Sequence, residues 1–355
     1  MVKPRIIAFY LPQYHPFKEN DEWWGKGFTE WTNVGKAKPL FRGHNQPRIP
    51  ADLGYYDLRV KEVREQQADL AREAGVEGFC YWHYWFNQNC QFMDDVFNEV
   101  LETGTPTLPF CLGWANHSWY AKTWNKDVPD KLLCEQKYLG YEDYDAHFNY
   151  ALKAFKDKRY IKIEGCPLFY IFDPLSLPSD FIPYWNKLAV EHGIKKIYFV
   201  GKLTKVENEE KLLQKGFSAL VPERMGEAYG HNPIWLRVIL RFFKLFSNKP
   251  KFCYSYEYAS KFFINEEDKK EYIIPQIIPQ WDHSPRSATR GTILYNSTPK
   301  LFAKHVRAAI EAVKNKRNPI IFLKSWNEWA EGNMMEPDLT FGKGYINALR
   351  EEIER

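Results

Sequence analysis

The chain contains, at residues 319–332, the stretch PIIFLKSWNEWAEG, in which an apolar run passes directly into tryptophans, an asparagine and two carboxylates. The run Ile320–Lys324 has the length and the β-branched content of a buried strand. The polar and aromatic residues that follow it are unusual for a turn that only reverses the chain. The stretch therefore predicts a buried strand that ends at a functional region.

Similar apolar runs alternate with amphipathic stretches along the chain. Strands are predicted at Ile6–Leu11, Gly78–Trp82, Leu108–Trp114, Leu168–Phe172, Ile197–Val200, Ala219–Val221, Ile273–Ile278 and Ile320–Lys324. Helices are predicted at Asp57–Ala74, Asp95–Glu102, Tyr144–Lys156, Phe181–Glu191 and Pro299–Asn315. Eight strand-then-helix units in 355 residues predict an α/β fold, a (β/α)8 TIM barrel. A doubly wound sheet is the alternative, but no glycine-rich phosphate turn follows the first strand.

The sequence has no Ser/Gly linker, no change in composition and no repeat, so residues 1–355 are predicted to form a single barrel domain. Loop insertions are predicted at about residues 12–56 and 222–270, and long loops in compact domains are usually functional. The first insertion is expected to fold over the C-terminal mouth of the barrel with its aromatic and acidic residues. These are Trp23, Trp24, Phe28, Glu30 and Trp31.

The composition is that of a globular protein with many aromatic residues. Hydrophobic residues make up 45% of the chain and charged residues 26%, whereas aromatics reach 17%, with 13 Trp, 22 Tyr and 25 Phe. Tryptophans near polar residues indicate a surface that binds flat, partly apolar rings such as sugars. The net charge of +4, without a basic patch interleaved with aromatics, argues against nucleic acid as a partner.

The sequence shows no pattern typical of a cysteine-bound metal, of a cleaved secretion signal or of a membrane span. The six cysteines show no metal-binding spacing, and the N-terminus has no long apolar region followed by a cleavage site. No apolar stretch reaches the roughly 18 residues that a membrane span requires. These features predict a reduced, cytoplasmic chain.

Residues Ile234–Phe246 read IWLRVILRFFKLF, which leaves two interpretations open. Arg237, Arg241 and Lys244 fall on one helical face, and the rest is mostly large and apolar. The segment is too short to span a bilayer but could lie in its interface, which would make the protein membrane-peripheral. A barrel helix whose apolar face is core is the interpretation that we favour.

The C-terminal ends of barrel strands are where active sites lie, and several ends carry polar and aromatic residues. This pattern predicts a cleft that binds an oligosaccharide or a polysaccharide. The predicted substrate-binding residues are Tyr10, Gln13, Tyr14, His15, Trp24, Glu30, Trp31, Trp82, His83, Tyr84, Trp85, Trp114, Asn116, His117, Trp119, Trp281, Asp282, Trp326, Asn327 and Trp329.

The predicted catalytic residues are Glu328 and Glu331, three positions apart. On a turn or a first helical turn, such residues place their Cβ atoms about 5–6 Å apart on one side. Two carboxyl groups at about 5–5.5 Å suit retaining glycoside chemistry, in which one is protonated and the other ionised. Their mutual repulsion and the apolar wall of Trp326 or Trp329 could separate the two pKa values in this way. The competing interpretation is a helix N-terminus that carries Glu because the macrodipole favours it.

Histidines at the predicted strand ends do not predict a metal site. His15, His83, His117 and His283 lack the convergent ligands and the spacing of such a site. We expect them to donate hydrogen bonds to substrate hydroxyls or to serve structure, and we expect no metal and no cofactor.

Long motifs in the sequence resemble a known family. FYLPQYHPFKENDEWWGKGFTEWTNVGKAKPLFRGHNQPRIPADLGYYDLR, GFCYWHYWFN, PQWDHSPR, NSTPKLF and SWNEWAEGNMMEPD are similar to WbsX-like polysaccharide-biosynthesis proteins, which are related to the endo-α-mannosidases of glycoside hydrolase family 99. The resemblance runs from Arg5 to about Arg350. It implies a (β/α)8 barrel without a metal at the reaction centre.

The resemblance also implies roles for the two acids. Glu328 would take the proton of the sugar's 2-hydroxyl, which attacks its own anomeric carbon, and Glu331 would protonate the leaving group. This is a substrate-assisted variant of retention. One departure concerns Trp114-Ala115-Asn116, which His117 follows where relatives usually carry an acid. That difference puts a mannose-type specificity in doubt.

The sequence therefore supports three hypotheses. The first is a retaining endo-glycosidase or transglycosylase that acts on a microbial surface polysaccharide or its precursor. The second is a glycosyltransferase of O-antigen, capsule or lipopolysaccharide assembly, although a barrel without a nucleotide-phosphate cradle is an unusual transferase. The third is a carbohydrate-binding barrel without catalysis.

Overall fold

The computed structural model describes residues 3–121, 130–230, 250 and 252–355. The chain divides into two compact units, which are described separately. Unit 1 comprises Met1–His15, Thr29–Glu77 and Pro222–Arg355, and unit 2 comprises Pro16–Phe28 and Gly78–Val221. The prediction of one domain over residues 1–355 is not tested by this division and stays a prediction.

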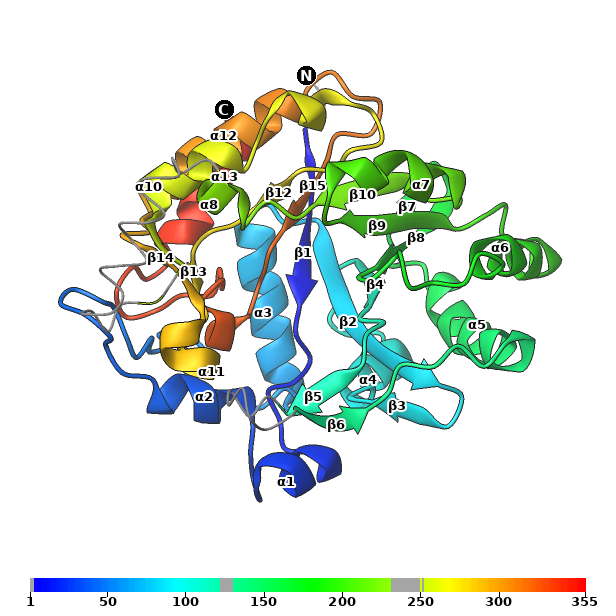
Figure 1. Ribbon diagram of the computed structural model, residues 1–355, viewed down its shortest axis with the longest axis horizontal. Helices are drawn as coiled ribbons and strands as arrows, with labels where there is room; N and C mark the ends of the chain where they lie inside the picture. Colours follow the sequence, from blue (N-terminus) through cyan, green and yellow to red (C-terminus); the bar gives the residue numbers. More distant parts are fainter. Residues whose placement is uncertain (1–2, 122–129, 231–249, 251) are drawn as a thin grey trace. The chain divides into compact units, whose positions relative to one another are not determined.

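Unit 1 contains a parallel sheet in which β15 (Ile320–Leu323) lies between β1 (Arg5–Tyr10) and β12 (Gln276–Ile277). Figure 1 shows β1 and β15 side by side, and their register runs from Arg5 opposite Ile320 to Ala8 opposite Leu323. Every residue of β15 and nearly all of β1 are buried, because both faces of a parallel sheet are covered in such folds. Direct pairing of the first and last predicted strands is what a barrel requires and what a doubly wound sheet lacks.

The longer helices of unit 1 follow the 3.6-residue pattern of the sequence. In α12 (Pro299–Val313), Thr298 caps the N-terminus by accepting a hydrogen bond from the Leu301 N–H, and Pro299 starts the first turn. The helix buries Phe302, His305, Val306, Ala309, Ala312 and Val313, which share one face. The other helices of unit 1 are α2 (Glu30–Lys36), α3 (Lys61–Glu73), α8 (Glu227–Gly230), α10 (Tyr256–Ala259), α11 (Ser284–Ser287) and α13 (Gly344–Glu354), with 3-10 turns η2 (Ser260–Phe262), η3 (Glu266–Lys269), η4 (Ala288–Arg290) and η5 (Trp329–Glu331).

A second sheet of unit 1 positions the segment that precedes α11. Its central strand β14 (Thr292–Tyr295) pairs in parallel with β11 (Phe252–Ser255) and antiparallel with β13 (Trp281–Asp282). This sheet was not predicted. It delivers Asp282 and the start of α11 to the vicinity of η5, the turn that contains Glu331.

Unit 2 contains the remaining parallel strands. The order is β10, β9, β8, β4, β2, and the strands are β2 (Gly78–Asn87), β4 (Phe110–Trp114), β8 (Cys166–Ile171), β9 (Tyr198–Leu203) and β10 (Ala219–Pro222). Short antiparallel strands accompany them: β3 (Cys90–Phe92), β5 (Trp119–Ala121), β6 (Lys131–Cys134) and β7 (Lys162–Ile163). The helices of unit 2 are α1 (Lys18–Trp24), α4 (Asp95–Thr103), α5 (Tyr141–Phe155), α6 (Phe181–Glu191), α7 (Glu209–Gln214) and the 3-10 turn η1 (Val206–Asn208).

The eight strands predicted from the sequence, β1, β2, β4, β8, β9, β10, β12 and β15, all occur, and the fold belongs to the predicted (β/α)8 barrel class. All five predicted helices occur as well, as α3, α4, α5, α6 and α12. The segment Ile234–Phe246 lies outside the described residues, so both of its interpretations stay predictions. Within the described ranges, no helix combines the length and the hydrophobicity needed to cross a membrane.

Candidate active site

The turn after β15 is fixed to its surroundings by backbone hydrogen bonds. The Trp326 N–H donates to the Phe9 carbonyl at 2.8 Å, and the Asn327 side chain bonds both the N–H and the carbonyl of Leu11, at 2.8 and 3.0 Å. The 3-10 turn η5 starts directly after Glu328 and contains Glu331. Both acids therefore lie on one turn that is anchored to the end of β1, where the sequence predicted a turn or a first helical turn.

Gly332 ends this turn at a point where only a glycine fits. Its φ is +63°, and a Cβ there would lie 2.8 Å from both the Cβ and the backbone nitrogen of Asp282. Real Cβ atoms do not approach other atoms so closely, and left-handed backbone disfavours side chains. The turn that carries the acids therefore packs directly on the segment that leads into α11.

The two tryptophans of the turn form an internal wall. Trp326 and Trp329 are buried, and the Trp329 indole N–H donates to Glu336 Oε2 at 2.6 Å. The Trp329 backbone N–H donates to the Tyr14 hydroxyl at 3.0 Å. These contacts suit the predicted apolar wall, but they leave neither ring as an open stacking platform. Contact of these rings with sugar stays a prediction.

Arg286, on α11, bridges three carboxylates. Its guanidinium donates to Glu331 Oε1 at 2.5 Å, to Glu30 Oε2 at 3.1 Å and to Glu328 Oε2 at 3.2 Å. The three acids come from α2, from the residue before η5 and from η5 itself. Glu30 and Glu328 are buried, and the Arg286 side chain is 22% exposed. A cation and a third carboxylate therefore lie beside the predicted acid pair.

The electrostatic environment separates the pKa values of the two predicted catalytic acids. Burial raises the pKa of Glu328 to about 8, although Arg286 acts in the opposite direction. Burial also acts to raise the pKa of Glu331, but Arg286 and, next in size, His283 outweigh it, and this pKa is lowered. The two shifts therefore favour a proton on Glu328 and an ionised Glu331.

A second ion pair lies near the acids. Lys324, at the end of β15, donates to Glu223 Oε2 at 2.8 Å, and its ammonium lies 4.9 Å from the centre of the Trp281 ring. Burial acts to lower the pKa of Lys324, but Glu223, followed by Glu331, outweighs it, so this pKa is raised. Lys324 is therefore a fixed cation beside the acid pair, and it was not predicted from the sequence.

Glu336 lies buried behind Trp329. Its carboxylate accepts hydrogen bonds from Trp329 at 2.6 Å, from the Tyr56 hydroxyl at 2.9 Å and from Gln67 Nε2 at 2.6 Å. Tyr10, predicted to bind substrate, donates to Gln67 Oε1 at 2.7 Å and is buried. Burial raises the pKa of Glu336 to about 7, although its hydrogen bonds act the other way. This network supports the acid turn from the inside.

Aromatic packing connects α2 to the acid turn. The Trp31 ring lies 4.6 Å from the Tyr14 ring and 5.5 Å from the Trp329 ring, and its N–H donates to the Tyr56 carbonyl at 2.7 Å. Thr29 caps α2, which places Glu30 at the first helical position. Trp31 thus holds the helix that supplies Glu30, and the first loop contributes directly to the site.

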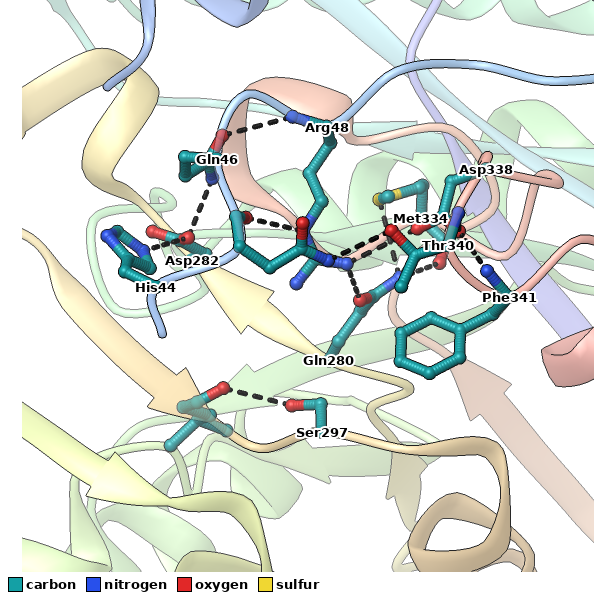
Figure 2. A network of polar contacts seen from close by, with 12 residues as sticks. His44, Gln46, Arg48, Gln280, Asp282, Ser297, Met334, Asp338, Thr340 and Phe341 are labelled. Atoms are coloured by element: carbon teal, nitrogen blue, oxygen red, sulfur yellow. Dashed lines mark hydrogen bonds and ion pairs between the residues drawn. The ribbon is translucent and has the colours of Figure 1, made fainter. Parts of the chain in front are cut away.

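Asp282 belongs to a buried network that Figure 2 shows. His44 Nε2 and Gln46 Nε2 lie 2.7 and 2.6 Å from Asp282 Oδ2. Arg48 contacts the side-chain oxygen of Gln280 in the same network. The network fastens the end of the first loop insertion to β13 and to the residues beside it.

The carboxylate of Asp282 has a structural task in this network. Its other oxygen accepts the Ser284 N–H at 3.0 Å, which starts α11 two residues before Arg286. Burial acts to raise the pKa of Asp282, but the hydrogen bond from His44 and those that follow it keep this pKa low. Contact between Asp282 and substrate stays a prediction, whereas its role in positioning α11 is evident from the geometry.

Several residues predicted at the strand ends of unit 2 form a buried cluster. His83 Nε2 lies 2.8 Å from His147 Nε2, and the His147 ring stacks on Trp85 at 4.7 Å. The Trp114 indole N–H donates to the Trp85 carbonyl at 2.7 Å, and the Asn116 side chain bonds the backbone of Asp173. These side chains are occupied by protein contacts, and their contact with sugar stays a prediction.

Other predicted residues of unit 2 reach the surface. His117 is exposed and lies 4.9 Å from the Phe172 ring, and Trp24 is 47% exposed. Trp82 and Trp119 are half-buried, the latter packed against the buried Tyr84. These surface residues can contact a ligand of unit 2 without rearrangement.

The site of unit 1 brings together Tyr14, Glu30, Trp31, Glu328, Trp329 and Glu331, all predicted from the sequence. Gln13 is half-buried, and His15 is buried. The sequence reasoning missed Arg286, Lys324 and Glu223. Arg286 lies in the quoted motif PQWDHSPR, and two adjacent acids that need a counter-charge could have directed attention to it. In the described part of the chain, no three His, Cys, Asp or Glu residues are grouped as ligands for a metal ion.

A family model described as Glycosyltransferase WbsX matches residues 6–349. The chain belongs to this WbsX family. Two relatives, each described as Uncharacterized protein WxcX and from two strains of Xanthomonas campestris pv. campestris, are 32% identical over 367 residues and 33% identical over 360 residues. Each alignment covers 99% of this chain and 50% of the relative. The WbsX-family chain therefore spans about half the length of the curated relatives it matches.

Solved structures share the fold of this WbsX-family chain. A glycoside hydrolase-like protein superposes with a TM-score of 0.63 at 16% identity, over 99% of this chain and 94% of the other. The GH99 endo-alpha-mannosidase from Bacteroides thetaiotaomicron, in complex with BIS-TRIS-propane, superposes with a TM-score of 0.59 at 15% identity, over 100% of this chain and 96% of the other. These likenesses confirm the barrel fold.

Proposed function

We propose that this WbsX-family protein is a carbohydrate-active enzyme that cleaves or transfers glycosidic bonds of a microbial surface polysaccharide or its precursor. The family description and the fold shared with an endo-alpha-mannosidase support an enzyme that acts on carbohydrate. The observation that carries the finer proposal is the acid pair that shares one proton. Two carboxyl groups with separated pKa values supply an acid and a base at the same pH, which in the unliganded site are Glu328 and Glu331 respectively.

The proposed reaction follows the substrate-assisted scheme that the resemblance implies. In the first step Glu328 takes the proton of the sugar O2, O2 bonds to C1, the glycosidic C1–O bond breaks, and Glu331 gives its proton to the leaving oxygen. In the second step a water or a sugar hydroxyl gives its proton to Glu331 and bonds to C1. The C1–O2 bond then breaks, and O2 takes the proton back from Glu328. Two inversions at C1 give net retention.

The charge state of the unliganded pair is the one that the scheme gives between its two steps. After the first step Glu328 carries the proton and Glu331 is ionised, and the electrostatic environment favours the same distribution. The pair holds the single proton that both steps require. Loss of that proton above about pH 8 should abolish the first step, whichever acid holds it in the Michaelis complex.

Leaving-group dependence tests the two roles. Glu331→Gln should lose turnover of glycosides with poor leaving groups and should retain most turnover of activated aryl glycosides, which need little protonation. Glu328→Gln should lose both, because no leaving group replaces activation of the 2-hydroxyl. The reverse pattern would exchange the roles of the two acids, and equal retention of both activities in both variants would reject the pair.

Transfer from a nucleotide sugar is the second candidate, because the family description names a glycosyltransferase. The charges of the site favour a glycan over a diphosphate donor. Its two cations, Arg286 and Lys324, are each bound to carboxylates, and added phosphates would meet surplus negative charge.

Calorimetry with nucleotide sugars and with mannose- or fucose-type oligosaccharides separates these candidates. We expect heat of binding with an oligosaccharide and none with a nucleotide sugar. Tight nucleotide-sugar binding would favour the transferase. Oligosaccharide binding that both Gln variants retain, with no turnover in the wild type, would indicate a binding protein without catalysis.

A further inference from the structure

Arg286 is placed to decide where the proton of the acid pair resides. Its guanidinium touches three carboxylates, one from α2 and two from the acid turn, and each is bound by a different nitrogen. The contact with Glu331, at 2.5 Å, is shorter than those with Glu30 at 3.1 Å and Glu328 at 3.2 Å. Hydrogen bonds between charged groups are shorter and stronger than neutral ones, and Arg286 is the group that most lowers the pKa of Glu331.

The local charge balance favours a proton on this group of carboxylates. With all three ionised, Arg286 alone would leave two uncompensated negative charges in a buried site, which is costly. The other titratable groups that face the acids are Tyr14, Glu223, His283 and Lys324. Lys324 is bound to Glu223 and therefore offsets the remaining charge only in part.

The position of Arg286 is itself fixed by the fold. The helix α11 starts at the Ser284 N–H held by Asp282, and Asp282 is held in turn by His44 and Gln46. Gly332 allows the acid turn to pack against Asp282 without a gap. The fold therefore holds the guanidinium and the two acids in fixed relative positions, and the three distances follow from this arrangement.

We propose that Arg286 is the positioning residue of the acid pair, which holds Glu331 as an ionised carboxylate and so leaves the shared proton on Glu328. The inference rests on the proposed function for its meaning in catalysis, where it favours the charge state between the two steps. The location of the proton, however, can be measured without any turnover. Arg286 acts through the acids, and we propose no direct contact between Arg286 and the substrate.

Carbon-13 NMR of protein labelled at the glutamate carboxyl carbon measures this location. Glu328→Gln and Glu331→Gln variants assign the two signals. In the wild type, the Glu328 signal should titrate near pH 8, and the Glu331 signal should be that of a carboxylate at neutral pH. A wild type with Glu331 protonated and Glu328 ionised at pH 7 would overturn the proposal without any Arg286 variant.

Variants of Arg286 test the cause. In Arg286→Gln the Glu331 signal should titrate at higher pH than in the wild type, because its main stabilising cation is lost. Arg286→Lys keeps the charge and should restore an ionised Glu331 at neutral pH. Arg307→Gln is the matched control, since it breaks another Arg–Glu pair, with Glu352, on α12 and α13. A purely structural role would lower the melting temperature of Arg286→Gln and leave the Glu331 titration unchanged.

The pH profile of kcat/KM provides a second readout. Arg286 lowers the pKa of Glu328, so the loss of activity at high pH should shift upward in Arg286→Gln and return toward wild type in Arg286→Lys. Wild-type turnover by the Glu328→Gln/Glu331→Gln protein would reject the proposed function and leave the titration result standing. If the double variant is inactive and the Glu331 titration is the same in the wild type and in Arg286→Gln, only the present inference is rejected.

Discussion

The acid site of unit 1 and the histidine cluster of unit 2 are built from similar residues and differ in charge. Both follow parallel strands and contain tryptophans beside polar side chains. In unit 1, Arg286 meets three carboxylates at 2.5–3.2 Å. In unit 2, His83 and His147 contact each other between aromatic rings, and burial lowers the pKa of both. The unit 2 imidazoles are therefore neutral, and we expect this cluster to stabilise the fold.

The comparison indicates which feature distinguishes a reactive site from a structural cluster. Aromatic and polar residues after a strand occur in both clusters, so this pattern alone does not distinguish a site from a core. A surplus of like charge does distinguish them, because burying several carboxylates is costly and is therefore retained mainly where these groups have a function.

His147→Ala should reduce stability and spare activity. The change removes a buried ring packed on Trp85, Trp114 and Trp185 and leaves His83 without its hydrogen-bond partner. We expect a loss of about 3–5 kcal/mol in the free energy of unfolding, measured by chemical denaturation. At a temperature where the variant is folded, kcat should equal that of the wild type. A fall in kcat without a fall in stability would make this cluster part of the active site.

Gly332→Ala should perturb the acid turn through its contact with Asp282. The left-handed φ and the 2.8 Å approach should together cost about 2–4 kcal/mol of stability. Gly342→Ala is the control, because Gly342 also has a positive φ, of 52°, but a Cβ there would meet nothing within 4 Å. Equal losses in the two variants would show that the packing between the acid turn and Asp282 contributes little.

The pH dependence of stability should have opposite signs in the two regions. Glu328 has a pKa of about 8 in the folded state and an ordinary value of 4.5. The folded state therefore binds the extra proton between these values, and its contribution makes the free energy of unfolding fall as pH rises from 4.5 to 8. Glu336 acts with the same sign up to about pH 7.

His83 has a folded-state pKa of about 3 against an ordinary value of 6.5. The unfolded state binds the extra proton in that window, so the contribution of His83 increases stability as pH rises from 3 to 6.5. Each group contributes a slope of at most about 1.4 kcal/mol per pH unit. Urea denaturation of the wild type, Glu328→Gln and His83→Gln across pH 4–8.5 measures both slopes. An unchanged slope above pH 6.5 in Glu328→Gln would contradict the assigned proton.

The smallest stability effect is expected at Trp24. Its side chain is 47% exposed and its nearest ring partner is Phe28 at 5.9 Å, so Trp24→Ala should change the free energy of unfolding by no more than about 0.5 kcal/mol. Trp31→Ala should cost more, since Trp31 packs on Tyr14 and Trp329. Saccharide binding by calorimetry should weaken in both variants. Unchanged binding in Trp24→Ala would remove this residue from the predicted ligand surface.

The sequence was sufficient for the strands because buried parallel strands appear as continuous apolar runs. Their ends were less certain: the predicted strand Ile273–Ile278 is reduced to Gln276–Ile277, since the Ile273 N–H turns back to the Lys270 carbonyl. The acid pair was predictable because Glu328 and Glu331 are close in sequence.

The role of Arg286 was not predictable in this way. It lies 256 residues from Glu30 and 42 from Glu328, and only the folded chain brings these groups within hydrogen-bond distance. The burial of Trp326 and Trp329 also depends on the tertiary structure. Aromatic residues beside acids look the same in sequence whether they line a cleft or support it from behind.

The most direct test of the account compares the wild type with Glu328→Gln/Glu331→Gln on the natural glycan, with release or transfer of sugar measured at the new chain ends. Both changes are nearly isosteric, so circular dichroism and the melting temperature should indicate a folded protein. General acid and base assistance is commonly worth about 10²–10⁴ in rate each, and the double variant should therefore show no turnover above background. A folded double variant that processes the glycan at the wild-type rate would contradict the account, because the chemistry would then reside elsewhere.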